Sequence, residues 1–174
     1  MTDTHISPEM AAAVGRPLSA GRDSFPIDAS DIRRWAIAVY YPEPPPRLFW
    51  DAAYAAGTTH GGIVAPEEFN PFAWTPPDRA PARTGGGDAP DPNYLERSLG
   101  LDPPSTRFML NGGVSASYGV RMRPGDVITS STSLAGYRER PGRLGLMLFS
   151  TTADEWTNQD GELVKRSEMT LIRY

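Results

Sequence analysis

The closing segment of the chain, Arg121–Tyr174, predicts three consecutive antiparallel strands and constrains the fold more than any other stretch. Turn-forming residues stand at Pro124-Gly125-Asp126, at Pro141-Gly142 and at Asn158–Gly161. β-Branched and apolar residues fill the stretches between these turns, as is typical of strands. Because helical patterns come earlier in the chain, we expect the α+β class.

Two helices are predicted before the strands. Apolar residues recur at helical spacing over Ile32–Tyr40, and Asp28 or Ser30 can cap this helix by accepting a backbone N–H. A second helix is predicted over Leu48–Ala56, with Gly57 just past its end.

A further helix start is predicted at Pro66, because proline suits the first helical position and Glu67 and Glu68 complement the helix dipole. Residues 75–105 are rich in Pro, Gly and Ala and predict a surface insertion, with a short helix over Tyr94–Leu99. The 174 residues are therefore expected to form one domain, 1–174, that carries this insertion at about 75–105.

Composition excludes several classes of function. The chain has no cysteine and only two histidines, which excludes disulfides and thiol nucleophiles and argues against a metal site. A formal net charge of −4 gives no basic surface for nucleic acid. No apolar run approaches the ~20 residues that span a bilayer, and no signal peptide is recognisable, so a cytoplasmic protein is expected.

Three sequence features resemble the MaoC-like hot-dog dehydratases and hydratases. Gly61-Gly62-Ile63-Val64-Ala65-Pro66 is similar to the family's G-x-I-V-A-P segment, although its next proline is Glu67 here. Leu110-Asn111-Gly112-Gly113 is similar to the family's L-H-G-G segment, with Asn111 in place of histidine. The strand set Arg121–Tyr174 completes the resemblance, which specifically suggests the family's N-terminal type of domain.

The resemblance implies a hot-dog fold, in which a curved antiparallel sheet wraps a central helix and two such units pair. It also implies an acyl thioester substrate, whose CoA or acyl-carrier pantetheine belongs to the substrate, so that no separate cofactor and no metal are expected. The substrate-binding candidates transferred from the two motifs are Gly62, Val64, Ala65, Pro66, Asn111, Gly112 and Gly113.

The family's catalytic Asp and His, within D-x-N-P-x-H, have no counterpart in this alignment. Pro44 stands at the Asp position and Phe49 at the His position, and neither side chain can transfer a proton. Glu43 and His60 are the remaining candidates for catalysis. For His60, an ordinary loop histidine is the simpler interpretation, because no carboxylate lies beside it in sequence to orient it.

The leading hypothesis is therefore a subunit of an acyl-CoA or acyl-carrier hydratase/dehydratase that forms the substrate-binding half of a double hot dog. A second hot-dog chain would supply the Asp and the His. The alternative is a non-enzymatic module that binds acyl thioesters or serves in assembly, as a homodimer. A third possibility is an enzyme that uses Glu43 with His60.

Overall fold

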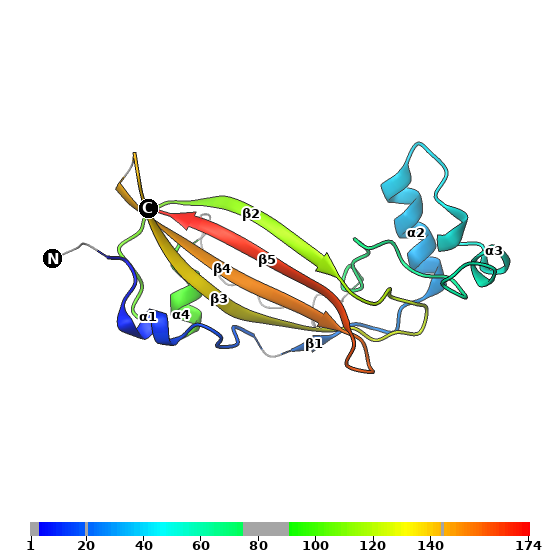
Figure 1. Ribbon diagram of the computed structural model, residues 1–174, viewed down its shortest axis with the longest axis horizontal. Helices are drawn as coiled ribbons and strands as arrows, with labels where there is room; N and C mark the ends of the chain where they lie inside the picture. Colours follow the sequence, from blue (N-terminus) through cyan, green and yellow to red (C-terminus); the bar gives the residue numbers. More distant parts are fainter. Residues whose placement is uncertain (1–3, 20, 75–90, 144) are drawn as a thin grey trace.

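The computed structural model describes residues 4–19, 21–74, 91–143 and 145–174. Within them, one five-stranded antiparallel sheet has the order β1-β3-β4-β5-β2 and curves along its length (Figure 1). The strands are β1 (Arg22–Asp23), β2 (Met109–Tyr118), β3 (Thr129–Gly142), β4 (Gly145–Thr157) and β5 (Leu163–Arg173). The helices are α1 (Pro8–Ala12), α2 (Ala29–Tyr40), α3 (Ala52–Ala56) and α4 (Tyr94–Ser98), with a 3-10 turn, η1 (Arg47–Phe49). The α+β prediction is confirmed.

The three strands predicted after Arg121 are β3, β4 and β5, which form the middle of the sheet. β3 pairs with β4 from Thr129 opposite Thr157 to Gly142 opposite Gly145, so Pro141 and Gly142 end β3 and do not form the turn itself. The turn at Asn158–Gly161 is stabilised by the Asn158 side chain, which accepts from the N–H groups of Asp160 and Glu162. Turn chemistry therefore sets the order of this meander.

Strand β4 is covered mainly on one face. Its apolar start predicts a strand buried on both sides, yet only Leu148 is fully buried, whereas Met147 and Phe149 on the opposite face are partly exposed. The prediction was wrong because the helices described in the structure pack against one side of this part of the sheet. Alternation along an antiparallel strand with one covered face explains the observed pattern.

Helix α2 confirms the first helix prediction. Asp28 is its N-cap, and its side chain accepts from the N–H of Ser30 at 2.7 Å. The second predicted helix is interrupted: η1 ends at Phe49 and α3 begins at Ala52. Asp51 separates them because its carboxylate caps α3 by accepting from the N–H of Tyr54 at 3.0 Å.

No helix begins at Pro66, so that prediction was wrong. Two turns occupy this stretch, at residues 67–68 and 71–74, and the N–H of Phe69 donates to the carbonyl of Pro66 at 3.0 Å across the first. Pro71 disfavours a helical conformation at Asn70, and the Asn70 side chain instead accepts from the N–H of Phe72 at 3.0 Å. Phe69 and Phe72 are both buried, so packing holds these turns in place.

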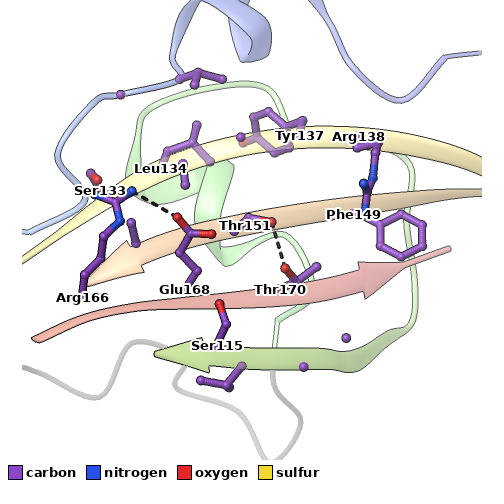
Figure 2. A pocket seen from close by; sticks show the side chains of 18 residues that line it. Ser115, Ser133, Leu134, Tyr137, Arg138, Phe149, Thr151, Arg166, Glu168 and Thr170 are labelled. Carbon is purple, nitrogen blue, oxygen red and sulfur yellow. Dashed lines mark hydrogen bonds and ion pairs between the residues drawn. The ribbon is translucent and has the colours of Figure 1, made fainter. Parts of the chain in front are cut away.

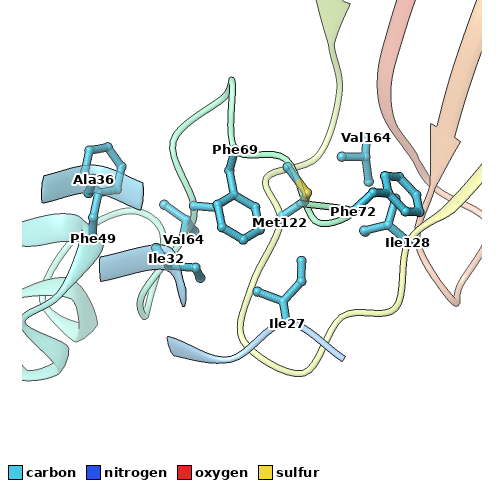
Figure 3. Packing of buried hydrophobic residues seen from close by; sticks show 11 residues of the cluster. Ile27, Ile32, Ala36, Phe49, Val64, Phe69, Phe72, Met122, Ile128 and Val164 are labelled. Carbon is cyan, nitrogen blue, oxygen red and sulfur yellow. The ribbon is translucent and has the colours of Figure 1, made fainter. Parts of the chain in front are cut away.

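The larger buried cluster lies where α2 and the turns after Gly62 meet the connection between β2 and β3 (Figure 3). Its buried members are Ile27, Ile32, Ala36, Phe49, Val64, Ala65, Phe69, Phe72, Met122, Ile128 and Val164. Trp35 packs against Phe69 edge to face, with ring centroids 5.7 Å apart. This cluster attaches the helical segment to one end of the sheet (Figure 1).

The smaller buried cluster lies at the other end of the sheet, where α1 and α4 are found (Figure 1). It consists of Ala13, Leu95, Leu99 and Leu134. Part of the predicted insertion, 75–90, lies outside the described residues. In the part that follows, α4 lies at the predicted Tyr94–Leu99 position, and Leu95 and Leu99 belong to the smaller cluster.

Candidate functional site

The loop that contains the first motif is tied to the connection after β2. The N–H of Ala65 donates to the carbonyl of Met122 at 2.8 Å, and the guanidinium of Arg121 donates twice to the carbonyl of Ala65, at 2.6 and 3.2 Å. Val64 and Ala65 are buried in the larger cluster. The backbone N–H of Ala65 is therefore already used, and these contacts hold the loop rigidly.

The second motif forms a β-bulge in β2. The register with β5 shifts between Asn111 and Gly113, and the Asn111 side chain accepts from the N–H of Gly113 at 2.8 Å. A Cβ at Gly112 would lie 3.0 Å from the carbonyl oxygen of Thr170 and 3.0 Å from Ile172, and Gly113 has φ +117. Glycine is thus required here by the bulge itself.

The two motifs lie near opposite ends of β2. Asn111 pairs with Leu171 of β5, whereas the loop around Ala65 contacts Arg121 and Met122, beyond the far end of β2 at Tyr118. Tyr118 lies seven positions after Asn111 along the strand, which corresponds to about 23 Å. The structure therefore does not bring the predicted substrate-binding residues of the two motifs into one site.

Gly112 and Gly113 border a broad groove of about 790 Å³ on the face of the sheet opposite α4 (Figure 2). Its side chains are mostly either small or hydroxylated, and the hydroxyls of Thr151 and Thr170 hydrogen-bond to each other at 2.9 Å. Arg166 of β5 forms ion pairs with Glu155 and Glu168 at one end. The hydrogen bonds that Arg166 donates to these carboxylates, Glu168 first, raise the pKa of Arg166 above its ordinary value, so it remains a cation.

The two catalytic candidates are not brought together. Glu43 is exposed in the loop after α2, and no hydrogen bond or ion pair joins it to His60. The carbonyl of His60 accepts from Arg123 at 2.7 Å, while its ring has no hydrogen-bond partner among the described residues. Phe49, which the alignment expected from the sequence places at the family's His, is 6% exposed and packs in the larger cluster.

A second cavity, of about 380 Å³, lies between α4 and the sheet. Its lining is largely apolar and comes from α4 and its approach, from the segment before β1, and from β2 to β5. The residues are Leu18, Ser19, Asp91, Pro92, Tyr94, Leu95, Met109, Thr132, Ser150, Thr152, Met169, Leu171 and Arg173. This volume falls in the range of small-molecule sites, ~300–1,000 Å³.

A buried polar network borders this cavity. Arg173 donates to both carboxylate oxygens of Glu96, at 2.6 and 2.7 Å, and to the Ser150 hydroxyl at 2.6 Å. The Tyr137 hydroxyl donates to Glu96 at 2.7 Å. Burial, followed by this hydrogen bond and the charge of Glu96, raises the pKa of Tyr137 above its ordinary value, so the phenol stays protonated.

Sequence reasoning missed this network and the cavity. Glu96 lies next to a Pro/Gly-rich stretch, where a carboxylate is expected in solvent. A signal was present at the end of β5, where Met169, Leu171 and Arg173 occupy alternate positions and therefore share one face of the sheet. An arginine on such a face needs a buried partner, which the sequence alone could not identify.

The described residues contain no group of three or more His, Cys, Asp or Glu suited to holding a metal ion. Also, no helix in the described part of the chain combines the length and apolarity that a membrane span requires.

The curved antiparallel sheet with few helices defines the chain as a hot-dog protein of the α+β class, and solved structures of low identity support this fold. The ChsH1–ChsH2 complex from Mycobacterium tuberculosis superposes with a TM-score of 0.63 at 19% identity, covering 95% of this chain and 87% of that one. The R-hydratase PhaJ1 from Pseudomonas aeruginosa gives 0.53 at 17% identity, covering 92% and 81%. The HadBC (3R-hydroxyacyl-ACP dehydratase) complex from M. tuberculosis gives 0.53 at 19% identity, covering 87% and 95%.

The family follows from the sequence itself. Residues 12–167 match the model of the FAS1-like dehydratase domain region, which covers most of the 174 residues. The chain therefore belongs to the family of FAS1-like dehydratase domains, in agreement with the dehydratase resemblance of its motifs and strands. No curated protein matches the sequence.

Proposed function

We propose that this chain is the substrate-binding subunit of a MaoC-like acyl-CoA or acyl-carrier hydratase/dehydratase. It forms half of a double hot dog, and a second hot-dog chain supplies the catalytic Asp and His. CoA or pantetheine enters only as part of the substrate, and no further cofactor takes part. The proposal retains the cytoplasmic location expected from the sequence.

The observation that carries the proposal is an apolar cavity in a chain of the dehydratase family. The alignment expected from the sequence supports it, because it places Pro44 and Phe49 at the dyad positions. A general acid or base must titrate and must reach the reacting atoms. Phe49 does neither, because it is an apolar side chain buried against Ala36 and other members of the larger cluster. The chain thus retains space for an acyl group without the groups that would transform it.

The open edge of β2 supports a paired assembly. Among the described residues β2 pairs with β5 alone, and all of its residues except the first and last are exposed. Leu110 and Val114 are 53% and 64% exposed, and no lysine or proline protects this edge. Long, apolar edges of this kind pair with another strand. A second hot-dog chain whose own edge strand aligns with β2 would extend the sheet.

Two of the structurally similar proteins are complexes of two different chains, namely ChsH1–ChsH2 and HadBC. HadBC is a 3R-hydroxyacyl-ACP dehydratase. These neighbours support a heteromeric assembly for this chain, at the level of fold.

The test is an enoyl-thioester hydration assay. The purified chain, a co-encoded hot-dog chain that carries D-x-N-P-x-H, and the mixture of the two are assayed separately with the same enoyl-CoA. We expect activity to require the mixture, and a stable complex to form. Full activity of this chain alone would contradict the proposal.

A homodimer that binds acyl-CoA without turnover, with no stimulation by any such partner, would instead support the non-enzymatic module. The His60→Ala variant addresses relocated catalysis: in the active mixture, its kcat should equal that of the parent chain. A loss of kcat on this substitution would restore His60 as a catalytic residue.

A further inference from the structure

The groove on the face of the sheet opposite α4 has a cationic end. Arg138 lies there, and Arg140 follows on the same face of β3, because side chains two positions apart in a strand share a face (Figure 2). Both arginines are exposed, and neither forms an ion pair within the part of the chain that the structure describes. Arg138 instead lies over the ring of Phe149, with its guanidinium carbon 5.5 Å from the ring centroid. This end of the groove therefore presents two positive charges to solvent.

The other end of the groove is anionic. Arg166 forms ion pairs with both Glu155 and Glu168, so these three side chains together retain one negative charge (Figure 2). Asp23 of β1 adds a second carboxylate on the same face, where it accepts a hydrogen bond from Thr129 at 2.7 Å. The side chains of Glu155 and Glu168 are 44% and 43% exposed, so a molecule that covers the groove can reach them.

The two ends are far enough apart to act separately. Phe149, which pairs with Arg138 across the β3–β4 ladder, precedes Glu155 by six positions, which corresponds to about 20 Å. This distance exceeds the Debye length of about 8 Å at physiological salt, so neither end neutralises the other. Small side chains such as Thr151 and Ala153 form the floor between them. A second sheet can therefore approach to the ~10 Å spacing of packed sheets.

This charge pattern is complementary to itself. When two identical sheets pack face to face about a two-fold axis that runs across their strands, the strands of one copy are reversed relative to those of the other. The cationic end of each copy then lies over the anionic end of its partner, and the contact occurs twice. A two-fold axis along the strands would place like charges together, which is unfavourable. The charges thus select a second copy of the chain and one orientation, with the strand directions aligned to within about 30°.

We propose that two copies of this chain associate face to face through the groove, with the cationic end of each copy against the anionic end of the other. This surface is distinct from the open edge of β2, because a strand that pairs at an edge leaves both faces of the sheet uncovered. The association goes beyond the proposed function and does not depend on it. If a hot-dog partner also pairs at β2, the face-to-face contact joins two such pairs.

The test uses two charge-reversed variants of the full chain, followed by sedimentation velocity over a series of concentrations. In Arg138→Glu/Arg140→Glu, both ends of the groove are anionic. In Glu155→Arg/Glu168→Arg, both ends are cationic. We expect the parent chain to dimerise, and the dissociation constant of each variant with itself to rise by on the order of tenfold or more. Mixing the two variants should restore the dimer, because each end then faces the opposite charge.

The control is Arg33→Glu/Arg34→Glu on α2, which makes the same change in net charge away from the groove and should dimerise as the parent does. A parent chain that stays monomeric throughout the series would overturn the proposal, and so would a mixture of the reversed variants that forms no dimer. A dimer that is lost in Val114→Lys but kept in both reversed variants would also overturn it, since the contact would then lie at the edge of β2.

Salt provides a check that needs no substitution. Because ions screen exposed charges, the dissociation constant of the parent dimer should rise by on the order of tenfold between about 50 and about 500 mM NaCl. A dimer whose dissociation constant does not change with salt would contradict the charge argument. Since this measurement uses the unaltered chain, it decides the matter even if a reversed variant does not fold.

Discussion

Arg173 and Glu96 form a two-point ion pair that joins the end of the last strand to α4, with N–O distances of 2.6 and 2.7 Å. Their exposed fractions are 1% and 0%, so solvent does not screen the pair. The short helix α4 contributes few apolar contacts, and this pair and the Tyr137 hydroxyl provide its polar attachment to the sheet. The position of α4, and hence the roof of the cavity, depends on this attachment.

Removing one partner of the pair should therefore destabilise the fold strongly. Glu96→Ala leaves the Arg173 cation buried without a partner, and we expect a loss of about 3–5 kcal/mol in the free energy of unfolding. Urea denaturation at neutral pH measures it. The double variant Arg173→Met/Glu96→Leu is the matched comparison and should lose much less, because apolar side chains of similar size replace both charges. Equal losses in the two variants would refute this account.

Close packing of backbone at Gly119 leads to a second prediction. A Cβ there would lie 2.0 Å from the carbonyl oxygen of Leu163, which is backbone and cannot rotate away. We expect Gly119→Ala to cost about 1–3 kcal/mol or more, as overpacking does. The control is Gly136→Ala in β3, where a Cβ meets nothing within 4 Å and where alanine should be neutral or slightly stabilising. Thermal unfolding of both variants decides the matter.

The strand meander and α2 were predictable because their signals are local. Asp28 caps α2 and the Asn158–Gly161 turn leads into β5, as the residue types suggest. The bulge at Gly112-Gly113 also has a local signal, since paired glycines in a strand favour a bulge. Local chemistry and the observed fold agree at these places.

The sequence was less informative where distant segments meet. The helix signal at Pro66 is genuine, yet Pro71 and the burial of Phe69 produce turns instead. Glu96 and Arg173 are 77 residues apart, and only the fold reveals that they pair. The same holds for the separation of the two motifs along β2, because a sequence motif contains no information about which end of the sheet it occupies.

The open edge of β2 gives a prediction about assembly. Val114→Lys places a charge at an exposed position of this edge, and we expect the affinity for a hot-dog partner to fall by on the order of tenfold while the unfolding temperature of the chain alone stays unchanged. Sedimentation velocity of the mixture measures the complex. Ser131→Lys, on the interior strand β3, is the control and should leave assembly intact. If both variants assemble normally, the interface lies elsewhere.

Because Asp28 caps α2, we expect the free energy of unfolding to depend on pH in the acid range. Hydrogen bonds from the side chain and then the backbone of Ser30 lower the pKa of Asp28 below its usual 3.8. A lowered folded pKa means that the stabilisation is present above pH 3.8 and is lost as the pH falls through the folded value. Asp28→Asn keeps the acceptor oxygen without titrating. The difference in unfolding free energy between the parent protein and Asp28→Asn should therefore shrink below pH 3.8. A constant difference from pH 7 to pH 3 would show that the charge of Asp28 does not stabilise α2.

Filling the cavity should weaken acyl binding without weakening the fold. Leu171 lines the space beneath α4, so Leu171→Trp should occupy part of the about 380 Å³. We expect affinity for a bulky acyl-CoA to fall by on the order of tenfold or more, and affinity for free CoA to stay the same, because only the acyl body is excluded. Leu163→Trp, at the exposed start of β5, is the matched control and should bind as the parent does. If Leu171→Trp retains full acyl affinity at an unchanged unfolding temperature, the acyl group binds elsewhere, and the groove on the opposite face of the sheet becomes the place to examine.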